Sequence, residues 1–362
     1  MMQQSAATVA PVDLTGFVEA CLERVGVNQE DAANTARFLV DADMLGVHSH
    51  GIDMLPSYYR GYQRGELNPS AIPSVVHRFA AITVVDAKNG LGFTPSRLAM
   101  NKAIKAASRY GIGVAVVRSS NHFGMASHWT RQAVASGMIG FATTNGPPVM
   151  APWGGRDALM CNNPVSWGIP AAEQPPVLFD VACSASSRGK IRLAALGDEP
   201  IPEGWALGPD GRPTSDPKVA LEGVLLPFSE HKGSGFAVVN ELLSSALSGA
   251  RALTQVPAIT PSSYGYHPSW EIGHFFIAMD PSAFDERERV LERVDRIVAT
   301  IRGSRPIPGV DGVKVPGERS TSKYDQSRLH GVSLPQSVKD KIFRFTVDED
   351  IEVLLPEELG RL

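Results

Sequence analysis

The chain has 362 residues, of which 43% are hydrophobic and 20% charged, and its formal net charge is -4. This composition is typical of a globular protein of roughly two domains with a sizeable core. Because the chain is mildly acidic and has no basic tract, we expect neither nucleic acid nor a membrane surface as a partner. No run approaches the ~18 consecutive apolar residues that cross a bilayer, and residues 1–5 lack the start of a leader sequence, which predicts a cytoplasmic protein.

The three cysteines are too few and too scattered for a disulfide framework or a cysteine-based zinc site. Cys21 lies on an apolar helical stripe and is predicted to be part of the core. Cys161 and Cys183 fall close to the candidate site described below, but no nucleophile motif surrounds them.

The N-terminal part predicts three helices. Apolar residues recur at helical spacing from Leu14 to Val25, and Asn28 is a suitable N-cap for a second helix that continues to Leu45. A third helix is expected from about Pro56 to Arg64.

The connection between the second and third helices is the first candidate site. It carries His48, Ser49 and His50 on a loop between two rigid elements, where catalytic side chains tend to lie. The ordinary pKa of histidine lies close to neutral pH, so a positioned histidine is a candidate proton donor or acceptor. The alternative is a turn whose polar side chains only cap the neighbouring helices.

The middle of the chain alternates between strand and helix patterns. This alternation predicts an α/β domain with a largely parallel or mixed sheet. The expected elements are two extended segments within 75–87, helices at about 95–109 and 125–135, and strands at 113–117, 139–143 and 177–181.

Polar residues follow these predicted strands. Asn121 and His122 come after one strand, Thr144 and Asn145 after the next, and Asp180 closes a third. Ligands of open α/β sheets bind beyond the carboxyl ends of the strands, so we expect these side chains to converge on one crevice.

The C-terminal part is expected to be more irregular. Residues 197–217 are rich in proline and glycine and are predicted to be a long loop. A helix at about 236–247, a strand at 272–279 and a charged helix at about 281–302 follow, with the irregular segment 306–317 behind them. The predicted buried stripe of the charged helix consists of Val290, Leu291, Val294, Ile297 and Val298.

No glycine fingerprint for a Rossmann nucleotide site is present. Gly90-Leu91-Gly92 and Gly233-Ser234-Gly235 each lack the third glycine at the required spacing. The residue patterns alone therefore disfavour a Rossmann dehydrogenase.

A series of short motifs, in order along nearly the whole chain, resembles the type 2 malate/L-lactate dehydrogenase family, which includes ureidoglycolate dehydrogenase, diketogulonate reductase and piperideine-2-carboxylate reductase. The motifs are Ser49-His50-Gly51, Asn121-His122-Phe123-Gly124, Pro152-Trp153-Gly154-Gly155, Asn163-Pro164, Phe179-Asp180-Val181-Ala182, Leu226-Pro227-Phe228, His231-Lys232-Gly233 and Val315-Pro316-Gly317-Glu318.

The resemblance implies a non-Rossmann, mixed-sheet NAD(P)-binding domain at about 74–239. Residues 1–73 together with about 240–362 would form a mainly helical domain for substrate binding and dimerisation. It implies an NAD(P)-dependent oxidoreductase of 2-oxo and 2-hydroxy acids that uses NAD or NADP, is a homodimer and has no metal. Cyclic-imine reduction is the alternative reaction.

The resemblance also assigns roles to residues. His50, oriented by Ser49, is the favoured proton donor, and His122 is the other candidate. The substrate-binding residues would be Tyr58, Met54, Asn162 and Arg188. The cofactor-binding residues would be His122, Phe123, Gly124, Met125, Ala126, Gly146, Asp180, Val181, Ala182, His231, Lys232, Gly317, Glu318 and Arg319. The start of the helix near Ala126 together with Lys232 would hold the diphosphate. Arg319, Ser320 and Lys323 are candidates for a 2′-phosphate, which leaves NAD versus NADP open.

Two departures from the family pattern bear on the substrate. Met54 stands where the family usually has an arginine that clamps the substrate carboxylate, and a thioether cannot replace a guanidinium. Arg188 and Arg60 are the alternative anchors. In addition, residues 186–190 lack the aspartate of the cyclic-imine reductases, which disfavours imine reduction.

Two other classes of function stay open. His48 and His50, with His122 or His128, have the residue types of a metal-dependent hydrolase, although a helix rather than a strand precedes them. The second class is a noncatalytic binding protein, which would have lost the arginine that the family usually has at position 54.

Overall fold

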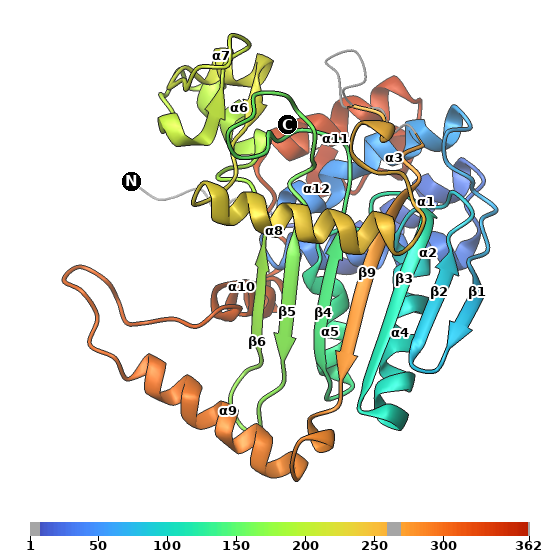
Figure 1. The fold of residues 1–362 in the computed structure, drawn as a ribbon. Helices are drawn as coiled ribbons and strands as arrows, with labels where there is room; N and C mark the ends of the chain where they lie inside the picture. Colours follow the sequence, from blue (N-terminus) through green and yellow to red (C-terminus); the bar gives the residue numbers. More distant parts are fainter. Residues whose placement is uncertain (1–7, 259–268, 361–362) are drawn as a thin grey trace.

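The computed structural model describes residues 8–258 and 269–360 and contains a seven-stranded mixed sheet (Figure 1). Its strand order is β1-β2-β3-β9-β4-β5-β6. Because β1, β5 and β9 run antiparallel to their neighbours, β2, β3, β4 and β6 all point the same way. The strands are β1 (Ser74–Phe79), β2 (Ile82–Asp86), β3 (Ile112–Ser120), β4 (Ile139–Thr144), β5 (Val165–Ile169), β6 (Val177–Val181) and β9 (Ile272–Met279). The predicted α/β class with a mixed sheet is confirmed.

Helices lie on both faces of this sheet. In Figure 1, α4 (Phe93–Tyr110) and α5 (Ser127–Ala135) lie behind the strands, and α8 (His231–Glu241) crosses in front of them. A small unit beside α8 contains α6 (Arg188–Leu196), α7 (Pro217–Glu222) and the short pair β7 (Ala206–Leu207) and β8 (Val224–Leu225). The region predicted as a long loop, 197–217, is mostly irregular as expected, and its regular elements are the short turn Glu203–Trp205, β7 and the first residue of α7.

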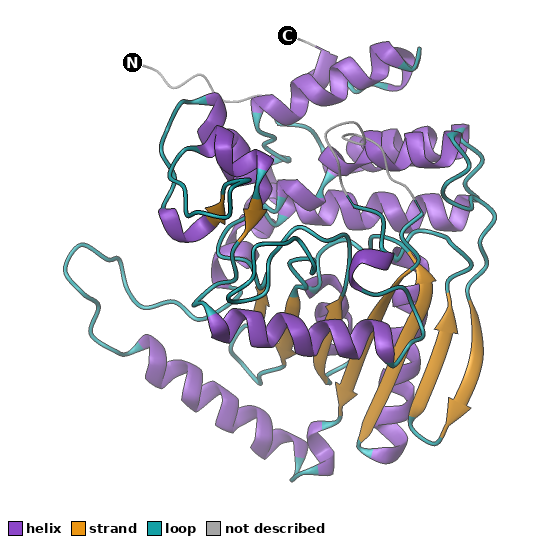
Figure 2. Ribbon diagram, turned by 45° about the horizontal axis from the view of Figure 1, so that its top comes forward, coloured by secondary structure: helices purple, strands orange, loops and turns teal. Residues whose placement is uncertain are grey.

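The helices of the two chain ends pack together (Figure 2). They are α1 (Pro11–Arg24), α2 (Gln29–Met44), α3 (Leu55–Gln63), α11 (Gln336–Asp348) and α12 (Glu357–Gly360). The rings of Tyr59 and Phe345 lie 5.2 Å apart between α3 and α11. One continuous core joins this group to the sheet, since it includes Leu39, Val117 and Phe276 as well as Phe345.

Local sequence signals explain where several helices begin and end. The side chain of Asn28 accepts a hydrogen bond from the backbone N–H of Asp31, so it is the predicted N-cap of α2. Gly111 ends α4 with a φ of 80°, a left-handed conformation that glycine adopts without a steric penalty.

The position of β9 differs from the sequence-based division of the chain. The prediction assigned residues from about 240 onward to the helical domain, but β9 pairs with both β3 and β4 in the middle of the sheet. Local sequence patterns identify the strand but do not show which partners it has.

Other differences are local. β5 and α6 were not predicted, and the helix expected from residue 236 already begins at His231. Gly233 lies inside this helix, where only a glycine fits because a Cβ there would lie 2.2 Å from the carbonyl oxygen of Phe228. α8 then continues as a π-helical turn, Leu242–Ala246.

Two C-terminal helices, α9 (Arg287–Arg302) and α10 (Glu318–His330), lie at the side of the sheet formed by β6. In Figure 1, α9 projects away from the sheet and α10 lies beside β6. Of the predicted buried stripe of α9, only Val298 is buried, and Ile297 is 60% exposed. Val290, Leu291 and Val294 are half-buried, so the described part of the chain covers this stripe only in part. None of the described helices has the length and apolar composition to span a bilayer.

Candidate functional site

A cavity of about 1070 Å³ opens at the edge of the sheet where β3, β4 and β6 end. His122, Thr144, Asn145 and Asp180 lie on its wall, so the predicted convergence of polar groups beyond the strand ends is confirmed for these residues. Asn121 lies buried beneath the wall, where its side-chain oxygen accepts a hydrogen bond from the backbone N–H of Trp270. The volume is at the upper end of the range for small-molecule sites.

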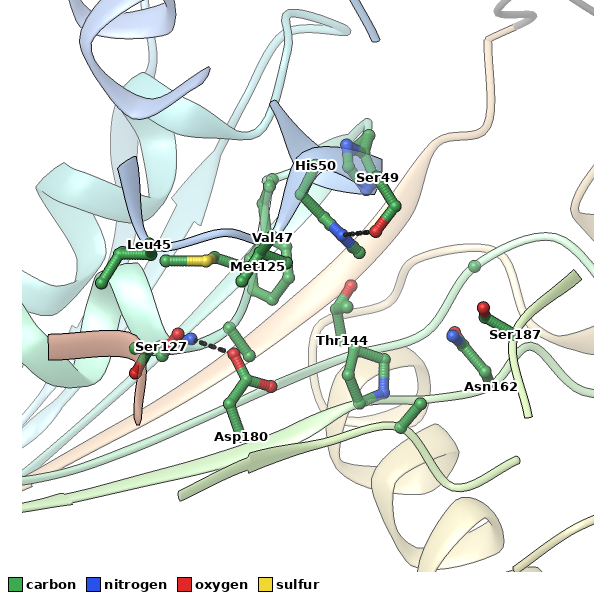
Figure 3. A pocket seen from close by; sticks show the side chains of 18 of the residues that line it. Leu45, Val47, Ser49, His50, Met125, Ser127, Thr144, Asn162, Asp180 and Ser187 are labelled. Carbon is green, nitrogen blue, oxygen red and sulfur yellow. Dashed lines mark hydrogen bonds between the residues drawn. The ribbon is translucent and has the colours of Figure 1, made fainter. Parts of the chain in front are cut away.

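Most of the predicted site residues share this cavity. Figure 3 shows Ser127 and Asp180 at one end, Asn162 and Ser187 at the other, and Ser49 with His50 above the space between them. The predicted residues on the wall are Ser49, His50, Met54, His122, Phe123, Gly124, Met125, Ala126, Gly146, Asn162, Asp180, Ala182, Arg188, Gly317 and Arg319. Val181 and Glu318 neighbour wall residues without lining the cavity.

The turn that carries the histidines is fixed by a buried carboxylate from the end of α2. Asp43 accepts hydrogen bonds from His48 Nδ1 and from the backbone N–H of Ile52, both at 2.8 Å. Burial raises the pKa of Asp43, and the two hydrogen bonds oppose that rise. A Cβ at Gly51 would lie 2.2 Å from this carboxyl group, so the turn closes tightly around it. His48 therefore has a structural role.

His50 points toward the cavity and is paired with Ser49. The hydroxyl of Ser49 lies 3.0 Å from His50 Nδ1. Burial lowers the pKa of His50, and the carboxylates of Asp180 and Asp53 only partly oppose this shift. His50 is therefore a neutral imidazole at neutral pH.

His122 lies next to His50 and is held from behind. The two rings are stacked, with centroids 5.5 Å apart. The hydroxyl of Tyr58 lies 2.5 Å from His122 Nδ1. Burial, with a smaller contribution from Tyr62, raises the pKa of Tyr58 well above its ordinary value, so the hydroxyl keeps its proton. Tyr58 was predicted to reach the substrate, but it is fully buried, does not line the cavity and instead supports His122.

Asp180 occupies the start of α5. Its carboxylate accepts a hydrogen bond of 2.8 Å from the backbone N–H of Ser127, the first residue of that helix. Burial raises the pKa of Asp180, and the hydrogen bonds from Ser127 lower it. This helix start was predicted to hold a diphosphate, yet its first N–H already has a carboxylate partner.

Two predicted cofactor residues lie away from the cavity. His231 and Lys232 are exposed in the first turn of α8 and do not line the wall. The described cations that do line it are Arg131, Arg188, Lys314, Arg319 and Lys323.

Of the two candidate anchors for the substrate carboxylate, Arg188 lies on the cavity wall and Arg60 does not. Arg60 pairs with Glu349 and Asp348 of α11 and its C-cap, outside the cavity. Arg188 lines the cavity, and its guanidinium donates to the carbonyl oxygens of Leu221 and Gly223, which fixes its direction. Met54 forms an apolar part of the wall.

A buried network under the wall was not predicted. His274 is fully buried in β9, and its ring nitrogens lie 2.7 Å from Thr144 Oγ1 and 2.8 Å from Ser120 Oγ. Burial lowers its pKa to about 3, so the imidazole is neutral. The ring of Phe123 stacks on it at 4.6 Å. A single histidine in an otherwise apolar strand was the sequence signal that marked this position.

The other reactive groups do not form a metal or nucleophile site. His128 is buried in α5, and burial lowers its pKa to about 3. Within residues 8–258 and 269–360, no group of three or more histidine, cysteine or acidic side chains is placed to hold a metal ion. Cys161 lines the cavity, but burial raises its pKa to about 12, so it is a protonated thiol.

Comparisons with known proteins agree with this arrangement. The family model of malate/L-lactate dehydrogenase matches residues 9–342. L-Sulfolactate dehydrogenase of Methanocaldococcus jannaschii is 38% identical over 299 residues, which cover 82% of this chain and 84% of that protein. Delta(1)-pyrroline-2-carboxylate reductase of Ancylobacter novellus is 33% identical over 319 residues, or 88% of this chain and 91% of that one. The solved structure of sulfolactate dehydrogenase from M. jannaschii superposes with a TM-score of 0.87 at 33% identity, covering 95% of this chain and 98% of that one.

Proposed function

The chain belongs to the malate/L-lactate dehydrogenase family, and we propose that it is an NAD(P)-dependent oxidoreductase that interconverts a 2-oxo acid and a 2-hydroxy acid. The observation that carries the proposal is one cavity in which two histidines face a wall with five cations and a single described carboxylate. When bound, the nicotinamide ring supplies or accepts the hydride. The protein has to bind two anionic molecules side by side and to move one proton.

The charges on the cavity wall favour the binding of two anionic ligands. The cations of the wall fall at separate places, with Arg188 at the start of α6 and Lys314, Arg319 and Lys323 around the start of α10. An anionic dinucleotide and a small organic acid both gain from such groups. Apolar side chains such as Met54 and Trp270 also line the cavity and would limit the access of water to the reacting groups.

His122 is the proton donor in this proposal, in place of His50, which the sequence favoured. The Tyr58 hydroxyl bonds Nδ1 of His122, and this bond orients the ring at the cavity wall. A hydroxyl keeps this bond in both charge states, because it donates to a neutral ring and accepts from a protonated one. Burial lowers the pKa of His50, which disfavours its cationic form. Ser49 and His50 complete the same wall and contact the substrate.

Arg188 anchors the substrate carboxylate. Asn162 and Ser187 lie at the same end of the cavity (Figure 3) and add polar groups there. Since Arg60 is already paired outside the cavity and position 54 is a methionine, Arg188 takes over the role that the usual arginine has elsewhere in the family.

Cyclic-imine reduction is the second candidate, because a relative of this chain is named for it. A protonated imine gains from a nearby carboxylate, and residues 186–190 supply none. The oxo acid reaction is therefore preferred.

We also propose that the protein is a homodimer, as is typical of the family, and that it is cytoplasmic. The outward face of α8 and its π-helical continuation carries Phe236, Val239 and Leu242, each more than half exposed. An apolar helix normally has no such uncovered face, and exposed apolar patches of this kind mark contacts between proteins. A second copy of the chain would cover it.

The reaction class is tested with the purified protein by following NADPH and NADH absorbance. The substrates to compare are pyruvate, oxaloacetate, sulfopyruvate and pyrroline-2-carboxylate. We expect turnover of at least one oxo acid, with a higher kcat/KM than for the imine, because residues 186–190 supply no carboxylate to stabilise the iminium. Turnover of the imine alone would contradict the assignment, and cofactor binding without any turnover would indicate a noncatalytic protein.

The proton donor is tested with His122→Asn, His50→Asn and Tyr58→Phe. Loss of a general acid lowers kcat by about 10²–10⁴-fold, and we expect this for His122→Asn with the cofactor Kd unchanged. Tyr58→Phe removes only the anchor and should lower kcat by roughly 10-fold, the value of one buried hydrogen bond. If His50→Asn shows the large loss and His122→Asn does not, His50 is the donor.

The acid anchor is tested with Arg188→Gln. Losing a charge-assisted pair should raise the KM of the oxo acid by about 10–100-fold and leave the cofactor Kd unchanged. Arg188→Lys should fall between this variant and the parent, because it keeps the charge without the planar fork. Arg60→Gln is the matched control. A raised KM for Arg60→Gln with an unchanged KM for Arg188→Gln would reverse the assignment.

The dimer is tested by analytical ultracentrifugation. The parent protein should sediment as a dimer, and the double variant Phe236→Asp, Leu242→Asp as a monomer, because carboxylates would be buried without partners in the contact. Val353→Asp, at a position 88% exposed elsewhere on the chain, is the control and should stay dimeric. A dimeric double variant would exclude this face from the contact.

A further inference from the structure

Beyond the reaction class, we propose that this chain selects NADP(H) over NAD(H), because Lys314, Arg319 and Lys323 form a site for the 2′-phosphate of the cofactor. This inference rests on the proposed function. It concerns the three cations around the start of α10, at the end of the cavity away from Arg188.

The backbone that carries these cations is fixed to the sheet. The carbonyl oxygen of Pro316 accepts a hydrogen bond of 3.1 Å from the N–H of Leu178 in β6. Gly317 then starts α10 with a φ of 99°, and a Cβ on it would lie 2.9 Å from the Cβ of Leu178. The segment therefore approaches the edge strand too closely for a side chain at this position, and the cations lie at a defined place on the wall.

Lys323 is positioned from the other side of the cavity as well. A Cβ at Gly46, just after α2, would lie 2.5 Å from Cδ and 2.7 Å from Nζ of Lys323. The lysine stem thus packs on the backbone next to Leu45, which itself lines the cavity close to Ser127 (Figure 3). This contact places the ammonium group across the cavity end and reduces the entropy it loses on binding an anion.

These cations have no partners among the residues that the structure describes. The side chains of Lys314, Arg319 and Lys323 form no hydrogen bond or ion pair with residues 8–258 or 269–360, although all three line the wall. Most exposed basic side chains need no ligand, but three that converge on one cavity end without a counter-charge leave a positive potential there. A dianionic phosphate neutralises it.

The groups that favour NAD(H) are absent from this end. Preference for NAD(H) depends on a carboxylate that accepts hydrogen bonds from the ribose hydroxyls, and the same carboxylate repels a 2′-phosphate. Asp180 is the only carboxylate on the wall among the described residues, and the Ser127 N–H already bonds it. Glu318 turns away to Arg302 of α9, 2.5 Å from its Nε. Three cations therefore lie where the two cofactors differ, against the single carboxylate of Asp180, which Ser127 already engages.

The test uses cofactor fragments that lack the nicotinamide, so that binding is measured without turnover. Isothermal titration calorimetry of the full-length protein would compare 2′,5′-ADP with 5′-AMP. We expect 2′,5′-ADP to bind at least about 10-fold more tightly, since each charge-assisted hydrogen bond contributes that much or more. The difference should shrink as salt is raised, because the site is close to solvent.

Variants identify the residues responsible. Lys323→Ala and Arg319→Ala should each weaken 2′,5′-ADP binding by about 10-fold and leave 5′-AMP binding unchanged. Lys323→Glu should bring the ratio of the two affinities to one or below. Lys105→Ala, an exposed lysine on α4 away from the cavity, is the control and should change neither.

The outcomes separate the two proposals. Equal binding of the two fragments, or tighter binding of 5′-AMP, would overturn the NADP(H) inference and leave the oxidoreductase assignment intact. An unchanged preference in both Lys323→Ala and Arg319→Ala would overturn the assigned residues. If neither fragment binds, the dinucleotide site itself is contradicted, whereas binding of 2′,5′-ADP alone supports the inference.

Discussion

The site depends on the buried imidazole of His274, which joins three strands where the cavity begins. It belongs to β9, and its two nitrogens bond Ser120 at the end of β3 and Thr144 at the end of β4. With a pKa lowered to about 3 the ring is neutral, so it carries no buried charge and satisfies both neighbours as a donor and an acceptor. His122 follows β3 directly, and Phe123 stacks on His274. The C-terminal part of the chain thereby determines where the catalytic wall lies.

The opposite wall comes from the N-terminal helices and is fixed by different contacts. Asp43 bonds both ends of the turn that carries Ser49 and His50, and Tyr58 reaches from α3 to Nδ1 of His122. The Tyr58 bond is the link between the two walls, because it joins a helix of the terminal group to the residue beyond β3. The residues proposed to act on the proton are therefore held by buried partners, whereas the cations proposed to receive the anionic groups lie nearer the surface. This division suits a site that has to admit two ligands and still keep the acid in place.

Sequence patterns predicted the elements and side-chain positions that depend only on local residue spacing. The helices that begin after Asn28 and near Pro56, the strands at 113–117 and 139–143, and the gathering of His122, Thr144 and Asp180 beyond the strand ends all follow from periodicity and from the geometry of open sheets. Contacts between distant segments did not follow. Nothing near residue 274 indicates that β9 separates β3 from β4, and the burial of Tyr58 behind His122 depends on how α3 packs on the sheet. His231 and Lys232 were assigned by resemblance alone, and the fold places them on the surface.

The central claim is that one cavity brings a nicotinamide and an oxo acid together for hydride transfer with His122 as the acid. The most direct measurement is the transfer of deuterium from C4-deuterated NADPH to an oxo acid, detected by NMR of the product. The account predicts deuterium at C2 of a single enantiomer of the hydroxy acid, because the two ligands are held in one orientation, and a strong decrease of this signal in His122→Asn. A product whose C2 carries hydrogen from the solvent in place of the deuterium, or a racemic product, would contradict direct transfer in this site.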